Sequence, residues 1–186
     1  MTNVFIFHGT GGYPEENWFG WLRRELERLG CNVIVPQFPT PQDQTPEKWF
    51  EVFEKYGKYT SDTILVGHSL GGTFALRVLE KANAPVKATF LVAAAAGVLP
   101  LKNFESDRPF IEKPFDWEKI RKNCGKIFVF QSKDDPLVSV GNGEEIAKNL
   151  KTELILYEGA GHFNAKAGYT EFEDLLELVK KELGEN

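Results

Sequence analysis

The chain has 186 residues, of which 42% are hydrophobic and 26% are charged, and its formal net charge at pH 7 is -5. This length and balance predict one globular domain over residues 1–186. The negative charge and the lack of a Lys/Arg run exclude nucleic acid as an expected partner, and no apolar run approaches the roughly 20 residues of a membrane-spanning helix.

The first residues and the cysteines indicate a compartment. The stretch from Met1 to His8 lacks the basic region of a secretory signal peptide and has the apolar character of a first strand. Cys31 and Cys124 lie far apart and outside any C-x-x-C motif, which favours reduced thiols over a disulfide. We therefore expect a cytoplasmic protein.

Six short apolar runs, rich in Val, Ile, Leu and Phe, follow one another along the chain. Such runs are typical of parallel strands that are buried on both faces. They cover residues 4–7, 32–35, 63–66, 88–93, 126–131 and 153–157. Because helical patterns alternate with them, the sequence predicts a doubly wound α/β fold: a mostly parallel six-stranded sheet with helices on both faces. Functional groups should then lie at the carboxyl ends of the strands.

The helical patterns have start and stop signals of their own. Gly30 follows an apolar stripe over residues 18–29 and stands where a helix-terminating glycine belongs. Thr45, followed by proline and glutamate, predicts the start of a helix whose aromatic stripe extends to Tyr56. Residues 170–173, Thr-Glu-Phe-Glu, predict a capping box at the start of the last helix.

Residues 97–115 break this alternation. The segment shows no clean periodicity and mixes three prolines and three phenylalanines with charged residues. A long irregular segment inside a compact domain is often functional. We expect an irregular insert that forms a cap or a pocket wall, against the alternative of a surface excursion that packs its own aromatic rings.

The sequence Gly67-His68-Ser69-Leu70-Gly71 stands between the third apolar run and a helical pattern. A G-x-S-x-G turn at such a junction holds the serine in a strained conformation with its hydroxyl exposed. The glycines are required because strand and helix nearly touch there. The five-residue pattern is weak by itself, and its position between strand and helix is what predicts Ser69 as a nucleophile.

A serine hydroxyl becomes a good nucleophile only when a base takes its proton. His162 lies in a glycine-rich loop just after the last apolar run and is the predicted base, whereas His68 should point into the structure. Asp135, directly before a proline after the fifth run, is the predicted acid, with Asp134 as the alternative. The order Ser, Asp, His along the chain is the order of an α/β-hydrolase triad.

Two backbone N–H groups must receive the charge that develops on the substrate oxygen. We expect them from Leu70, at the start of the helix after Ser69, and from Thr10, with Gly11 as the next choice. The same glycine-rich loop starts like a dinucleotide fingerprint, but Pro14 stands where the third glycine belongs. Neither a Walker sequence nor metal-ligand spacing is present, so we expect no cofactor and no metal.

With these residues in place, the chain resembles the small serine hydrolases of the retinoblastoma-binding type, which include the bacterial YdeN-like proteins, within the α/β-hydrolase superfamily. The segments that carry this resemblance are His8-Gly9-Thr10-Gly11-Gly12, Asn17-Trp18-Phe19-Gly20-Trp21-Leu22, Gly67-His68-Ser69-Leu70-Gly71-Gly72, Asp134-Asp135-Pro136 and Gly161-His162-Phe163. The resemblance implies a compact hydrolase without the usual first two strands, with Ser69, Asp135 and His162 as nucleophile, acid and base. It also implies carboxylesterase-like activity.

The sequence therefore predicts a serine hydrolase that cleaves small esters through an acyl-enzyme intermediate. The aromatic rings of residues 97–115 suggest that the substrate has an apolar acyl or alcohol group. The alternative is a protein-binding module on a hydrolase scaffold with vestigial activity. No peptide groove or large charged patch can be recognised in the sequence to support that alternative.

Overall fold

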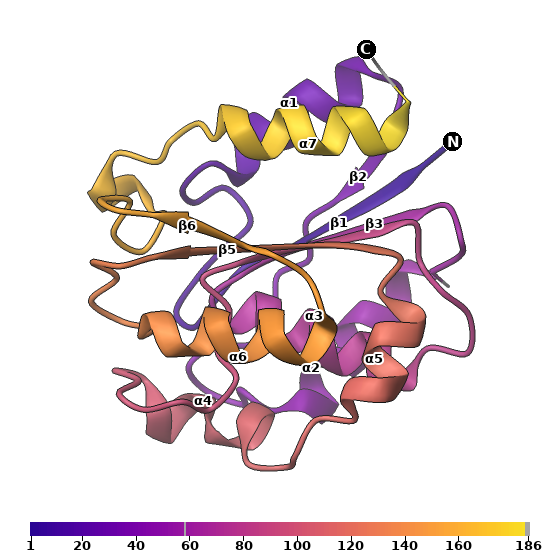
Figure 1. Ribbon diagram of the computed structural model, residues 1–186. Helices are drawn as coiled ribbons and strands as arrows, with labels where there is room; N and C mark the ends of the chain where they lie inside the picture. Colours follow the sequence, from indigo (N-terminus) through magenta and orange to yellow (C-terminus); the bar gives the residue numbers. More distant parts are fainter. Residues whose placement is uncertain (58, 185–186) are drawn as a thin grey trace.

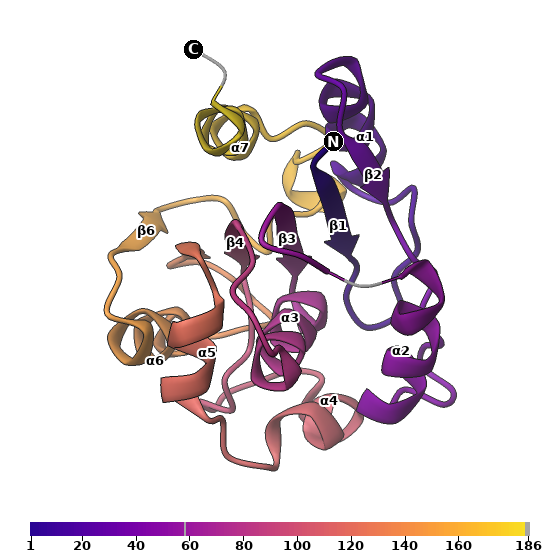
Figure 2. The same cartoon turned by 90° about the vertical axis from the view of Figure 1, so that its right-hand side faces the viewer.

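The computed structural model describes residues 1–57 and 59–184, and they form one six-stranded parallel sheet (Figures 1 and 2). The strand order is β2-β1-β3-β4-β5-β6. The strands are β1 (Asn3–Phe7), β2 (Asn32–Ile34), β3 (Thr63–His68), β4 (Ala88–Val92), β5 (Lys126–Ser132) and β6 (Leu154–Tyr157). Each predicted strand is present to within two residues at either end, so the predicted α/β fold is confirmed.

The strand order reverses between β1 and β3, which pair in register with Val4 opposite Ile64. At such a reversal, the loops that follow two neighbouring strands run to opposite faces of the sheet. A crevice therefore opens between these loops at the carboxyl edge. The loop after β1 contains residues 8–12, and the turn after β3 contains Ser69. The topology thus brings two of the segments singled out in the sequence to one place.

Helices cover both faces of the sheet (Figure 1). On one face lie α1 (Phe19–Arg28) and α7 (Glu173–Leu183), and on the other lie α2 (Pro46–Phe53), α3 (Leu70–Lys81), α5 (Trp117–Asn123) and α6 (Val140–Leu150). The short α4 (Phe104–Ile111) packs against α3, and two 3₁₀ turns, η1 (Glu54–Tyr56) and η2 (Ala165–Ala167), complete the elements. None of the helices among the described residues is long and apolar enough to cross a bilayer.

The alternation of side chains along the strands divides the core in two. In β1, Val4 and Ile6 belong to the cluster under α1 and α7, whereas Phe5 and Phe7 belong to the cluster under α2 and α3. Both clusters are fully buried, as a parallel sheet covered on both faces requires. Burial of such side chains contributes about 1.5–3 kcal/mol each, which makes the sheet a rigid support for the loops at its carboxyl edge.

Three local predictions differ from the structure. The 97–115 segment is not irregular throughout, because it contains α4; Pro109 lies inside this helix, and the full burial of Phe110 fixes the helix against the core despite the lost backbone donor. Tyr56 is 48% exposed and does not continue the aromatic stripe of α2. No capping box forms at residues 170–173, since α7 begins at Glu173 without a side-chain cap.

Candidate active site

Ser69 occupies the sharp turn between β3 and α3. Its backbone has φ 55° and ψ -126°, a region that a residue with a Cβ rarely adopts. The turn needs its glycines, because a Cβ on Gly71 would lie 2.1 Å from the carbonyl oxygen of Phe7 and a Cβ on Gly67 would lie 2.5 Å from that of Gly71. Strand and helix therefore touch at this point as the sequence predicts, and Ser69 stands at the apex.

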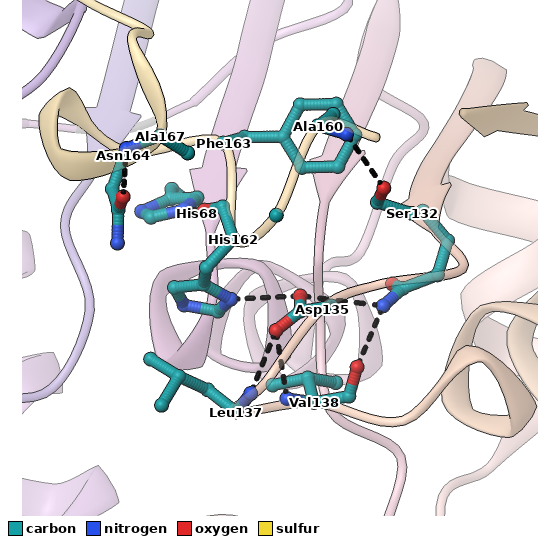
Figure 3. Close-up of polar contacts among 12 residues, drawn as sticks. His68, Ser132, Asp135, Leu137, Val138, Ala160, His162, Phe163, Asn164 and Ala167 are labelled. Atoms are coloured by element: carbon teal, nitrogen blue, oxygen red, sulfur yellow. Dashed lines mark hydrogen bonds and ion pairs between the residues drawn. The ribbon is translucent and has the colours of Figure 1, made fainter. Parts of the chain in front are cut away.

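His162 and Asp135 form a buried hydrogen-bonded pair. Nδ1 of His162 lies 2.8 Å from Oδ2 of Asp135, and the two side chains are 5% and 0% exposed (Figure 3). The other carboxylate oxygen, Oδ1, accepts hydrogen bonds from the backbone N–H groups of Leu137 at 2.8 Å and Val138 at 3.0 Å. Because an ionised carboxylate only accepts, Nδ1 of His162 carries the proton and Nε2 is left as an acceptor.

Ser69 and His162 both line a cavity of about 220 Å³ at the carboxyl edge of the sheet. Gly9 and Thr10 line the same cavity, and a Cβ on Gly9 would lie only 2.9 Å from the Cβ of Ser69. Within residues 1–57 and 59–184, no hydrogen bond joins Ser69 Oγ to His162. Hydrogen bonds of this kind are often long or poorly aligned before substrate binds, so the absence of this one in the free protein is no argument against His162 as the base.

The adjacent Asp134 has a different environment. Its Oδ1 accepts hydrogen bonds from the hydroxyl of Ser132 at 2.5 Å and from the backbone N–H of Gly161 at 2.9 Å. These hydrogen bonds lower the pKa of the Asp134 carboxyl. Of the two aspartates considered in the sequence, Asp135 is the one that contacts His162, while Asp134 ties the end of β5 to the histidine loop.

The other two histidines, His68 and His8, are buried, and each forms hydrogen bonds with backbone groups. Nε2 of His68 donates to the backbone carbonyl of His162 at 2.7 Å, so His68 supports the loop that carries the predicted base. Burial, followed by the nearby charge of His162, lowers the pKa of His68 to about 3. His8 accepts from the N–H of Phe38 through Nε2, and burial lowers its pKa as well.

The backbone donors expected for a substrate oxygen lie on two elements. Leu70 is the first residue of α3, and Thr10 lies in the turn Gly9–Gly12, which is closed by a hydrogen bond from Gly12 N to Gly9 O at 3.1 Å. In the part of the chain that the structure describes, neither the N–H of Leu70 nor that of Thr10 donates to another protein group. The N–H of Gly11, the second choice, is occupied by Thr40 Oγ1 at 2.7 Å.

The remaining cavity wall is polar. Besides His68, it consists of Glu16, Asn17, Asn103, Leu137, Asn164 and Lys166, of which only Leu137 is apolar. Burial raises the pKa of Glu16 to about 7, partly offset by a backbone hydrogen bond from Tyr13 and by the charge of His162. Asn103 belongs to the 97–115 segment, and Asn17 belongs to one of the segments that carry the family resemblance. No sequence pattern indicates the other four residues, because side chains in loops carry no periodic signal.

The phenylalanines of residues 97–115 are absent from this wall. Phe110 is buried in the core under α2 and α3, and Phe115 packs against the guanidinium of Arg77 at 3.8 Å. The apolar acyl or alcohol group suggested by these rings therefore has no support in the cavity lining. Among the described residues there is also no group of three His, Cys, Asp or Glu side chains that could hold a metal ion.

Comparison with known proteins identifies the family of this chain. The model of the protein family described as "Serine hydrolase" matches residues 4–181. The chain is 32% identical to the serine hydrolase RBBP9 of Rattus norvegicus over 185 residues, covering 98% of this chain and 96% of that protein.

Solved structures give the same result for the fold. The ydeN gene product of B. subtilis superposes with a TM-score of 0.91 at 26% identity and with complete coverage of both chains. A YdeN-like hydrolase from Pectobacterium atrosepticum has a TM-score of 0.71 at 22% identity, with 97% of this chain and 90% of that chain covered. The match to the family model, over residues 4–181, extends over all the segments that form the site.

Proposed function

Because the chain belongs to the serine hydrolase family, we propose that it is a carboxylesterase-like enzyme that cleaves small esters through Ser69, His162 and Asp135. One observation carries the proposal. A serine in a strained turn shares a cavity with a histidine whose tautomer is fixed by a fully buried aspartate. A vestigial site would have no need to keep a buried carboxylate hydrogen-bonded to a histidine, since burial of such a group destabilises the fold unless its partners compensate.

The chemistry follows from the donor and acceptor pattern. Nε2 of His162 takes the proton of the Ser69 hydroxyl as Oγ attacks the ester carbonyl carbon. The N–H groups of Leu70 and Thr10 donate to the tetrahedral oxyanion, and the dipole of α3 favours the same negative charge. Collapse of this intermediate breaks the ester C–O bond, and the alcohol leaves with the proton from His162.

The second half of the cycle repeats these steps with water as nucleophile. His162 takes a proton from water as the water oxygen attacks the acyl carbon on Ser69. Collapse of this second tetrahedral intermediate breaks the bond between the acyl carbon and Ser69 Oγ; Oγ takes the proton back from His162, and the carboxylic acid leaves. Asp135 holds the imidazole orientation and stabilises the imidazolium, without itself taking a proton. The reaction needs no cofactor, because every proton and every developing charge is handled by a group of the chain.

The cavity supports a small and polar substrate. Its volume of about 220 Å³ lies below the range of about 300–1,000 Å³ typical of pockets for drug-sized ligands. Asn103 comes from the 97–115 segment, which in this proposal supplies one wall of the pocket. Short acyl esters should therefore be cleaved better than long ones, and kcat/KM should fall as the acyl chain grows from acetate to octanoate.

The experiment that tests this function is labelling by a fluorophosphonate probe together with hydrolysis of p-nitrophenyl acetate. The wild-type protein should react with the probe and turn over the ester, and Ser69→Ala should do neither. Ser61→Ala is the matched control, because Ser61 is exposed at the opposite, amino-terminal end of β3. If the wild type is not labelled, or if Ser69→Ala keeps the wild-type rate, the proposed function fails and the protein-binding alternative gains support.

A further inference from the structure

A hydrogen-bond network that joins distant segments of the chain surrounds the turn Gly9–Gly12. The hydroxyl of Thr10 donates to Oδ1 of Asp107 on α4 at 2.5 Å. Nε2 of Gln44 donates to Thr10 Oγ1 and to Asp107 Oδ1, both at 3.1 Å. Because the carboxylate can only accept, the directions of all three hydrogen bonds are fixed.

The same network reaches the other side of the turn. The hydroxyl of Thr40 donates to Oε1 of Gln44 at 2.5 Å and accepts from the backbone N–H of Gly11 at 2.7 Å. Thr10 and Gly11 are the two central residues of the turn. The side chain of Asp107 holds Thr10 and that of Thr40 holds Gly11, and both of these side chains also bond Gln44. Rotation of the Thr10–Gly11 peptide would break the hydrogen bond to Thr40, and displacement of the Thr10 side chain would break the hydrogen bonds to Asp107 and Gln44.

The central group of the network is costly to bury. Asp107 is 6% exposed, and desolvation raises the pKa of its carboxyl, partly offset by the hydrogen bonds from Thr10, Ser106 and Gln44. A buried carboxylate destabilises a fold unless its hydrogen bonds compensate. Neutral groups could close the turn without this cost. A charged acceptor makes shorter and stronger hydrogen bonds, and these restrict motion more than neutral ones do.

We propose that Asp107 is a positioning residue for the ester hydrolysis: through the hydroxyl of Thr10 it holds the Thr10 N–H in the orientation that the oxyanion requires. This inference rests on the proposed function. It also gives α4 a role in the site: the phenylalanines of α4 do not line the cavity, but Asp107 of α4 supports the turn that faces Ser69. Gln44 and Thr40 act with Asp107 by fixing the second peptide of the turn.

The test compares variants that remove the acceptor, keep it, or remove its donor. Asp107→Ala and Thr10→Val should each lower kcat for p-nitrophenyl acetate by about 10- to 100-fold, the effect expected when a transition-state donor is misplaced. KM should change by no more than about threefold, because the oxyanion exists only in the transition state. Asp107→Asn keeps an acceptor oxygen but loses the charge, so its kcat should lie between that of Asp107→Ala and that of the wild type.

Two controls separate positioning from folding. Ser106→Ala removes a donor to Asp107 at 3.2 Å without touching Thr10, and it should keep the wild-type rate. Asp107→Ala combined with Thr10→Val should be no slower than either single variant, because both break the same hydrogen bond. If Asp107→Ala does not fold, Thr10→Val still decides the question, since it removes one hydroxyl at nearly constant volume.

A trifluoromethyl ketone provides a readout that a purely structural role would not change. This probe adds to the active serine and forms a tetrahedral oxyanion, so its affinity should weaken in parallel with kcat/KM across the variants. An unchanged kcat and an unchanged affinity in Thr10→Val and Asp107→Ala would overturn the positioning role, provided that Ser69→Ala is inactive. Activity in Ser69→Ala would instead overturn the proposed function.

Discussion

Replacing Asp135 with asparagine should invert the tautomer of His162 without changing the shape of the site. Oδ1 of Asp135 accepts from the backbone N–H groups of Leu137 and Val138, so the oxygen of an asparagine must face these two donors. Its NH₂ group then takes the position of Oδ2, 2.8 Å from Nδ1 of His162. Nδ1 must accept this hydrogen bond, and the proton moves to Nε2.

A protonated Nε2 cannot take the proton of Ser69, which removes general-base catalysis while the rest of the site remains. The expected loss in kcat is about 10⁴-fold, equivalent to about 5.4 kcal/mol of barrier at 1.36 kcal/mol per factor of ten. The opposite orientation of the amide is disfavoured, because it would place NH₂ against two buried N–H groups and leave them unpaired, at about 1–3 kcal/mol each. The assay is single-turnover and steady-state hydrolysis of p-nitrophenyl acetate.

Asp134→Asn is the matched control for this experiment. Asp134 is adjacent in sequence but contacts Ser132 and Gly161 rather than His162, so its replacement should leave kcat within about threefold of the wild type. A rate for Asp135→Asn within tenfold of the wild type would refute the tautomer argument. A large loss for Asp134→Asn alone would show that the acid had been assigned to the wrong residue.

Three further variants test other parts of the structure. Gly9→Ala places a Cβ 2.9 Å from that of Ser69 and should lower kcat by about 10- to 100-fold. Gly159→Ala is the control, because a Cβ there meets open space and should leave kcat unchanged. Equal rates for the two variants would contradict the close approach of Gly9 to Ser69. Gly71→Ala should lower the urea midpoint, because a clash that costs about 1–3 kcal/mol exceeds the gain of about 1 kcal/mol in helix propensity; a raised midpoint would contradict this. The unfolded chain protonates His68 near its ordinary pKa of 6.5, but the folded chain does so only near about 3, so the free energy of unfolding should fall as the pH decreases through this window. When the pH is lowered from 7 to 5, the free energy of unfolding of His68→Gln should fall by about 2 kcal/mol less than that of the wild type. Equal decreases in the two proteins would exclude this linkage.

The sheet and the serine turn could be predicted from the sequence because their signals are local. An apolar run marks a strand that is buried on both faces, and the glycines around Ser69 are needed wherever a strand and a helix touch. Asp135 is favoured over Asp134 as the acid because it stands directly before Pro136. In each case the physical constraint acts on residues that are close together in the chain.

The rest of the site depends on contacts between distant segments. The hydrogen bond from Thr10 to Asp107 joins residues 97 positions apart, and no pattern around either residue indicates it. The support of the His162 loop by His68 spans 94 positions in the same way. The proline and the mixed composition of α4 oppose a helix in the sequence pattern. Contacts with distant segments stabilise α4, among them the burial of Phe110 in the core and the hydrogen bonds of Asp107.

The most direct test is to trap the covalent intermediate that a nucleophilic serine must form. Rapid acid quenching of the protein with p-nitrophenyl acetate, followed by peptide mass spectrometry, should locate the acetyl group on Ser69. The acetylated fraction should rise in step with the first burst of p-nitrophenol and should be lost in His162→Ala. An acetyl group on another residue, or a protein that turns over the ester without acetylation of Ser69, would contradict the account.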